Sequence, residues 1–180
     1  MTKNNMLHYP LTVLQMEQLN QNSKVIIYTE LNDISNINEL FKDTDSLIIL
    51  YLLESQFSGH YTTLFKNKDS KNNDIFNFFD PYGFSVDKQL DFLTQEQRKE
   101  LDEKKNVLYK LLEPYDVIFN NIRFQGRGTQ TCGQHVTYRL HNKGLSAQQY
   151  YDKFKKMNIN NPDVFVANYV LNFFQKNNIS

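Results

Sequence analysis

Apolar residues along the chain recur with two different periods, and the succession of these periods predicts the fold class. Apolar, β-branched or aromatic runs of strand length lie at residues 24–31, 46–54, 59–67, 75–80 and 115–125. Helical patterns lie at residues 10–20, at 86–112 in two pieces, and in three closing stretches that begin near Cys132, Ser146 and Pro162. This succession of elements predicts an α+β domain.

Cap and turn residues mark the ends of these elements. Thr12 and Ser146 are good N-caps, and Pro162 fits the first turn of a helix. The polar stretch 66–74 has no apolar period and predicts a hairpin loop, and Pro81 ends the strand that follows. Because the chain has neither repeats nor a low-complexity tail, all 180 residues are predicted to form one domain.

Composition narrows the class of protein. Hydrophobic residues make up 40% of the chain and aromatic residues 14%, without any Trp, so Phe and Tyr dominate the expected core. Lys plus Arg and Asp plus Glu both number 20, and this neutral balance indicates no bulk attraction to nucleic acid or to membranes. The longest apolar run, Leu47–Leu53, is too short to span a bilayer.

The chain contains a single cysteine, Cys132. One cysteine excludes an internal disulfide framework and a zinc site built from several thiolates, and we expect no metal and no other cofactor. A free thiol suits a reducing compartment. The first ten residues lack the apolar stretch of a signal peptide, so no leader is expected.

The position of Cys132 suits a nucleophile. If a helix begins at or just after Thr131, then Cys132, Val136 and Leu140 lie on one inward face. Free backbone N–H groups and the helix dipole stabilise a thiolate in the first turn. Gly133 lets another chain come close to the backbone there. The alternative is an inert structural cysteine that packs as a small hydrophobic residue.

A cysteine nucleophile needs a base, which is usually a histidine, and the chain has four histidines. His8 lies in a polar segment and is expected to be exposed, and His141 ends a helix, where a cation is common. His135 is on the same helix as the cysteine and cannot easily reach the thiol, so we expect it to cap or to pack at the surface. His60, which follows Gly59 at the start of a strand, is therefore the candidate base.

Two further residues complete the candidate site. Asp80 ends an aromatic strand, and folding the hairpin would bring its carboxylate to the imidazole of His60; the same residue can also lead a β-turn. Gln125 is predicted to end a strand seven residues before the cysteine, where its amide can donate to an oxyanion. Gly126 and Gly128 would let the intervening loop curl around the site.

The order of these residues resembles that of the adenovirus-type cysteine proteases (the adenain family), which share a clan with the SUMO-type deconjugating proteases. Phe78–Ser85 (FFDPYGFS) resembles adenain's Phe, acidic, Pro, aromatic, Gly, Phe, Ser. Gly59–Tyr61 (GHY) resembles the clan's His with a following aromatic, and Gln125–Gly133 (QGRGTQTCG) is similar in content and spacing. Papain and transglutaminase, in which the cysteine comes first, do not have this order.

The resemblance implies a papain-like cysteine protease core with the adenain-type order: His on a strand, Asp on the next strand, Cys at a helix N-terminus, and a central mixed sheet flanked by helices. It implies that Cys132 is the nucleophile, that His60 is the general base and that Asp80 orients His60, where adenain has Glu. It also implies an oxyanion hole made by Gln125 and the backbone N–H of Cys132. The implied substrate contacts are Gly59, Tyr61 and Gly133.

Two departures separate this chain from adenain-type enzymes, which are activated by viral DNA and by a capsid-derived peptide joined through a disulfide. A disulfide here would have to use Cys132 itself, which would block the nucleophile. Binding DNA as a cofactor calls for a basic track, and the chain is neutral. We therefore expect a protease that needs neither DNA nor a tethered peptide. We also expect it to be a monomer.

The biological role that the resemblance implies is maturation of a double-stranded DNA virus or of a virus-like element, such as a virophage or a Maverick/Polinton transposon. Its substrates would be capsid or scaffold proteins cut at Gly-containing sites, in the virion and in cytoplasmic viral factories, without a membrane partner. Two alternatives are a deconjugating protease for a ubiquitin-like modifier and a non-catalytic interaction domain on the same fold.

Overall fold

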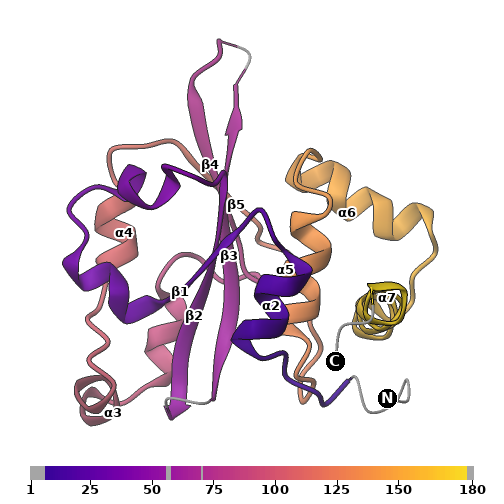
Figure 1. The fold of residues 1–180 in the computed structure, drawn as a ribbon, viewed down its shortest axis with the longest axis horizontal. Helices are drawn as coiled ribbons and strands as arrows, with labels where there is room; N and C mark the ends of the chain where they lie inside the picture. The colour runs from indigo at the N-terminus through magenta and orange to yellow at the C-terminus, as the bar shows by residue number, and fades with distance from the viewer. Residues whose placement is uncertain (1–6, 56–57, 70, 178–180) are drawn as a thin grey trace.

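A mixed sheet of five strands divides the protein into two layers of helices, as the computed structural model of residues 7–55, 58–69 and 71–177 shows (Figure 1). The strands, in spatial order, are β1 (Lys24–Ile27), β2 (Ser46–Ser55), β3 (Ser58–Lys68), β4 (Asp74–Phe79) and β5 (Val117–Phe119). The three central strands are antiparallel, whereas β1 and β5 run parallel to their neighbours. The ends of the predicted domain, and most of the segment considered for a signal peptide, lie outside the described residues.

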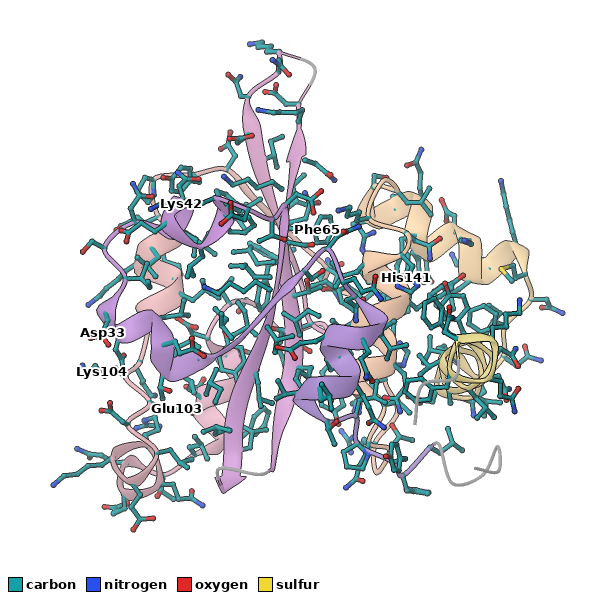
Figure 2. The ribbon with its side chains drawn as sticks, viewed as in Figure 1. Asp33, Lys42, Phe65, Glu103, Lys104 and His141 are labelled. Atoms are coloured by element: carbon teal, nitrogen blue, oxygen red, sulfur yellow. The ribbon has the colours of Figure 1, made fainter. Side chains whose placement is uncertain are left out.

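Each face of the sheet is covered by its own group of helices. One group is α2 (Val13–Leu19), α5 (Cys132–Leu140), α6 (Ala147–Lys156) and α7 (Pro162–Asn177). The other is η1 (Tyr28–Asp33), η2 (Ile37–Phe41), η3 (Lys88–Phe92), α3 (Gln95–Glu100) and α4 (Val107–Leu112). A hydrophobic core lies on each face of the sheet, and alternate residues of β2 point into opposite cores. Ile48 packs with the first group of helices, and Leu47 and Ile49 pack with the second. Figure 2 shows Phe65 on the α5 side of the sheet.

Helix α5 lies between β3 and α7, and all nine of its residues are buried. Arg139 is buried without an anionic partner among the described residues, yet its guanidinium donates to the carbonyls of Asn142 at 2.7 Å and Leu145 at 2.9 Å. These bonds satisfy a polar group that would otherwise be costly to bury. Burial on all sides gives the first residue of α5 a fixed position.

Two predicted strands are wrong over part of their length. The strand over 24–31 ends at Ile27, whose N–H donates to Glu30 Oε1 at 2.8 Å and so begins a 3-10 helix. The strand over 115–125 shortens to β5. There Asn120 accepts from the N–H of Asp80 at 2.9 Å and donates to the carbonyl of Asp80 at 2.8 Å, so a side chain replaces strand pairing.

The region 86–112 forms three short helical pieces rather than the predicted two. Asp87, Asp102 and Asn106 interrupt it with left-handed φ angles of 64°, 54° and 61°. The first helix, the N-caps Thr12 and Ser146 and the three closing helices are confirmed. Within the described part of the chain, every helix is too short or too polar to cross a membrane.

Candidate active site

Cys132 is the first residue of α5, and its side chain lies on the inward face that the sequence predicts. It is 8% exposed, and Val136 and Leu140 behind it are buried. The N–H of His135 donates to the carbonyl of Thr131 at 3.0 Å, which is the first i to i−4 bond of the helix. The backbone N–H groups that precede His135, including that of Cys132, have no i−4 carbonyl within the helix and can donate to another acceptor.

His60 and Asp80 meet at the start of the β3–β4 hairpin. His60 lies on β3 opposite Tyr51 of β2, and Asp80 follows the last residue of β4. The Nε2 atom of His60 lies 3.1 Å from Oδ1 of Asp80, and both residues are buried, with exposed fractions of 4% and 0%. The structure thus brings together the base and the orienting carboxylate that the sequence proposes.

Several donors fix the carboxylate of Asp80. The N–H of Tyr82 donates to Oδ1 at 2.6 Å, and the amide of Gln89 donates to Oδ2. The N–H of Gly83 also donates to the carbonyl of Asp80 at 2.8 Å, which closes a β-turn with Gly83 at a left-handed φ of 75°. Asp80 therefore leads a turn and contacts His60 at the same time.

The thiol and the imidazole form a coupled pair. Burial alone would raise the pKa of Cys132, but the hydrogen bond and charge of His60, together with the N–H groups of Tyr61 and Gly133, lower it. Burial alone would lower the pKa of His60, and the charge and hydrogen bond of Asp80, aided by Cys132, raise it. Because Nε2 of His60 faces Asp80, the nitrogen left for the thiol is Nδ1. These shifts favour a thiolate–imidazolium pair near neutral pH.

An aromatic stack holds the imidazole in place. The rings of His60 and Tyr82 are stacked with centroids 5.0 Å apart and planes at 21°. The guanidinium carbon of Arg123 lies 5.0 Å from the centroid of the Tyr82 ring. Tyr82 lies past the last β3–β4 pair, Thr63 with Phe79, so the turn that follows β4 brings its ring to His60.

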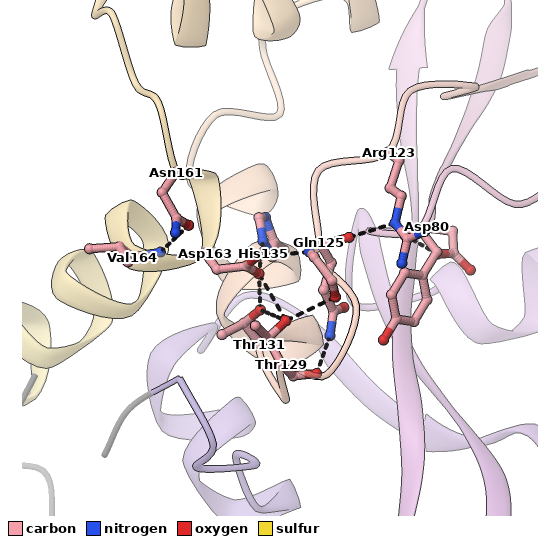
Figure 3. A network of polar contacts seen from close by, with 11 residues as sticks. Asp80, Arg123, Gln125, Thr129, Thr131, His135, Asn161, Asp163 and Val164 are labelled. Atoms are coloured by element: carbon pink, nitrogen blue, oxygen red, sulfur yellow. Dashed lines mark hydrogen bonds and ion pairs between the residues drawn. The ribbon is translucent and has the colours of Figure 1, made fainter. Parts of the chain in front are cut away.

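Gln125 lies in the loop after β5 rather than at the end of a strand. Its N–H donates to the carbonyl of Pro81 at 2.9 Å, and its side-chain amide donates to the carbonyl of Thr129 at 2.9 Å. The residue is 2% exposed, and Arg123 donates to its carbonyl at 2.7 Å (Figure 3). One N–H of the amide is therefore held by the protein, and the second N–H has no acceptor within the described residues.

A cavity of about 540 Å³ opens onto these groups. Cys132, His60 and Gln125 line it, together with Tyr61 and the segment that leads into α2. Asp80 lies behind His60, outside the lining. The walls of the cavity are mostly apolar. An extended peptide could therefore lie over the thiol while the polar side chains of the lining contact the peptide backbone.

The two glycines proposed to contact substrate have packing roles in the structure. A Cβ at Gly59 would lie 2.2 Å from the carbonyl oxygen of Tyr51, so glycine permits the pairing of β2 with β3. A Cβ at Gly133 would lie 3.0 Å from the sulfur of Met16 and 3.1 Å from Leu11, so the chain close to Gly133 is the protein's own N-terminal segment. Gly59 lines the cavity and Gly133 does not; substrate contact by either stays a prediction.

The remaining histidines lie away from the thiol. His8 is exposed, as predicted, and His141 at the end of α5 contacts the hydroxyl of Tyr169 at 2.8 Å. The prediction that His135 caps or packs at the surface is wrong, because it is fully buried with Nε2 3.1 Å from Oδ1 of Asp163. Within the described ranges, no three His, Cys, Asp or Glu side chains are grouped closely enough to hold a metal ion.

Sequence reasoning missed the residues that support the site from other elements, namely Tyr82, Gln89, Asn120, His135 and Asp163. An aromatic residue inside the Asp-Pro-Tyr-Gly turn was a usable signal for Tyr82. The others lie in stretches that read as ordinary loop or helix, and their contacts arise only in the folded chain.

No family model matches the sequence, and no curated protein matches it. Several solved structures are similar at low identity. A protease of ASFV has a TM-score of 0.45 and 13% identity, over 93% of this chain and 69% of that one. The central domain of an uncharacterised Legionella pneumophila protein has a TM-score of 0.43 and 12% identity, over 97% and 95%. A de-sumoylating protease has a TM-score of 0.39 and 12% identity, over 92% and 81%.

Proposed function

We propose that this protein is a cysteine endopeptidase that cleaves capsid or scaffold precursors of a virus or a virus-like mobile element. The observation that carries the catalytic part is that Cys132 and His60 line one cavity as hydrogen-bond partners, while Nε2 of His60 lies 3.1 Å from Asp80 behind it. A merely structural cysteine needs neither an imidazole partner nor a lowered pKa.

The proposed reaction uses each group in turn. The thiolate of Cys132 attacks the scissile carbonyl carbon, a C–S bond forms, and the new oxyanion accepts hydrogen bonds from Gln125 and from the N–H of Cys132. The C–N bond breaks as His60 gives its proton to the leaving amine, which leaves a thioester. Water then attacks the thioester while His60 takes its proton, and the acid product leaves with the thiol restored.

The depth of the nucleophile supports a preference for small residues at the cut. Cys132 and His60 are 8% and 4% exposed, so a peptide must bring its backbone deep into the cavity to reach the sulfur. A glycine beside the scissile bond has no side chain to exclude. We therefore propose cleavage at Gly-containing sites; a peptide library cleaved without any glycine preference would contradict this.

The setting of the activity is proposed from the motif resemblance and from the chain's charge. The chain is neutral and its sole cysteine is the proposed nucleophile, so we propose that the enzyme works without DNA and without a disulfide-linked peptide. We also propose that it acts as a monomer. Its substrates place it in the virion and in cytoplasmic viral factories. Equal peptide turnover with and without added DNA is the expected result, and a large stimulation by DNA would contradict it.

Co-expression with the candidate capsid precursor tests the function directly. Wild type is expected to cleave the precursor, and Cys132→Ala, which keeps the packing of a small side chain, is expected to leave it intact. A vinyl-sulfone probe built on a ubiquitin-like modifier forms the second arm. Labelling by that probe without precursor cleavage would favour a deconjugating protease, and failure of both arms with an unreactive thiol would favour an interaction domain.

A further inference from the structure

Asp163, at the start of α7, anchors the loop that joins two parts of the proposed oxyanion hole. Its Oδ2 accepts from the N–H of Gly126 at 2.8 Å. Its Oδ1 accepts from the hydroxyl of Thr129 at 3.2 Å and from the hydroxyl of Thr131. His135 Nε2 lies 3.1 Å from the same oxygen (Figure 3). One carboxylate therefore contacts the beginning, middle and end of the loop 126–131.

This loop controls where two oxyanion donors lie. Gln125 immediately precedes it and Cys132 immediately follows it. The carbonyl of Thr129 also receives the side-chain amide of Gln125 at 2.9 Å, so the loop orients that amide directly. A shift of the loop would thus move the amide of Gln125 and the N–H of Cys132 relative to each other. His60 and Asp80 lie on the hairpin and would not move with it.

Gly126 shows how closely the loop and the carboxylate are fitted. A Cβ at this position would lie 2.8 Å from Oδ2 of Asp163. The φ angle of Gly126 is not left-handed, so lack of space and not conformational freedom favours glycine here. Gly128 differs, because its φ of +78° requires glycine although a Cβ there would meet nothing within 4 Å.

The charge states of Asp163 and His135 are consistent with four hydrogen-bond donors around the Asp163 carboxylate. Burial raises the pKa of Asp163, but hydrogen bonds from His135, Thr131 and the Gly126 N–H lower it to about 2, so the group is ionised in use. Burial lowers the pKa of His135 against the opposing effect of Asp163. A neutral His135 with its proton on Nε2 donates to the carboxylate. Every contact on Asp163 is then a donor facing an acceptor.

We infer that Asp163 is a positioning residue for the oxyanion hole, through which α7 sets the distance between the Gln125 amide and the Cys132 N–H. The inference rests on the proposed function. It extends the site from the sheet and α5 to a helix whose residues do not line the cavity. Correct docking of α7 is then a condition for turnover, although α7 supplies no reacting group.

Two substitutions disturb the anchor in different ways. Asp163→Asn places an NH₂ group opposite either the Gly126 N–H or the three donors on Oδ1. Gly126→Ala keeps every polar group and pushes the loop away from Asp163. Asp152→Asn on α6 is the matched control for the first, since the one hydrogen bond of its side chain within the described residues comes from Gln148 at 3.0 Å. Gly144→Ala is the control for the second, since a Cβ there would meet nothing within 4 Å.

Both loop variants are expected to lower kcat roughly 10- to 100-fold with KM within about threefold, because one displaced oxyanion donor costs up to about 10³-fold. Affinity for a peptide aldehyde, whose adduct places an oxyanion in the hole, should fall by a similar factor. The rate of Cys132 alkylation at pH 6 should stay within about twofold of wild type, because His60 and Asp80 are undisturbed. The two controls should match wild type.

A merely structural role would give a different pattern. Turnover, aldehyde affinity and alkylation would then fall together, in step with the melting temperature. Wild-type kcat and aldehyde affinity in folded Asp163→Asn and Gly126→Ala would also overturn the inference. If Asp163→Asn is too unstable to assay, Gly126→Ala decides the question. An inactive wild type would instead contradict the proposed function.

Discussion

The two halves of the candidate site are held by different kinds of structure. His60 and Asp80 belong to the sheet half, where strand pairing and a closed turn fix the backbone. Gln125 and the approach to Cys132 belong to the loop half, where Asp163 and neighbouring side chains replace strand pairing. In the proposed mechanism, the sheet half forms the thiolate–imidazolium pair, and the loop half binds the oxyanion that develops during reaction.

If the proposed mechanism holds, formation of the nucleophile and stabilisation of the oxyanion depend on different contacts and can be disturbed separately. The proposed thiolate depends on His60 of β3, the strand on which α5 packs, and the proposed oxyanion hole depends on a loop anchored to α7. Damage to the sheet half should therefore change both alkylation and turnover. Damage to the loop half should change turnover alone.

The largest effect is expected for Asp80→Asn, which breaks the sheet half. The new amide would face the donors Gln89 or Tyr82, and it would no longer stabilise a charged His60. We expect kcat to fall roughly 10²- to 10⁴-fold and the alkylation profile of Cys132 to move to higher pH. Asp74→Asn at the exposed start of β4, where the carboxylate contacts Lys68, is the control. Unchanged alkylation would show that the carboxylate does not act through His60.

A smaller loss is expected for Gln125→Ala, which breaks the loop half. Losing one oxyanion donor should lower kcat roughly 10²- to 10³-fold, while alkylation at pH 6 keeps its wild-type rate. Gln130→Ala is the comparison, because Gln130 also lines the cavity, and its backbone N–H, which donates to the carbonyl of Leu7, is kept in the variant. An equal loss in both variants would remove the special role of Gln125.

The smallest effect concerns stability in acid. The pKa of Asp163 is lowered from 3.8 to about 2, so its ionised form stabilises the fold above pH 3.8, and this contribution disappears as pH falls through about 2. The shift corresponds to about 2 kcal/mol. Urea unfolding should show the gap between wild type and Asp163→Asn shrinking by about that amount from roughly pH 5 to pH 2. A constant gap would mean that the carboxylate charge contributes nothing.

Local patterns predict most of the sheet half. The aromatic runs of strand length over 59–67 and 75–80, with a polar stretch between, predict a hairpin, and this hairpin brings His60 to Asp80. The N-terminus of α5 is likewise predicted from the residues around Cys132.

The loop half could be predicted only in part. The position of Gln125 depends on Asn120 ending β5 early and on the carbonyl of Pro81, and neither contact has a local signature. Asp163 after Pro162 reads as an ordinary first-turn acid of a helix. Its role appears only when α7 packs against α5, because the contacts join residues 28 to 37 positions apart.

The central claim is that His60 and Cys132 form a thiolate–imidazolium pair. Alkylation by iodoacetamide across pH 4 to 10 measures it directly, and because Cys132 is the only cysteine the signal needs no deconvolution. We predict rapid alkylation of wild type at pH 6 that declines only at lower pH, and a profile for His60→Ala displaced upward to at least the ordinary thiol range. Slow alkylation of wild type at pH 6, with a profile that His60→Ala leaves unchanged, would contradict the account.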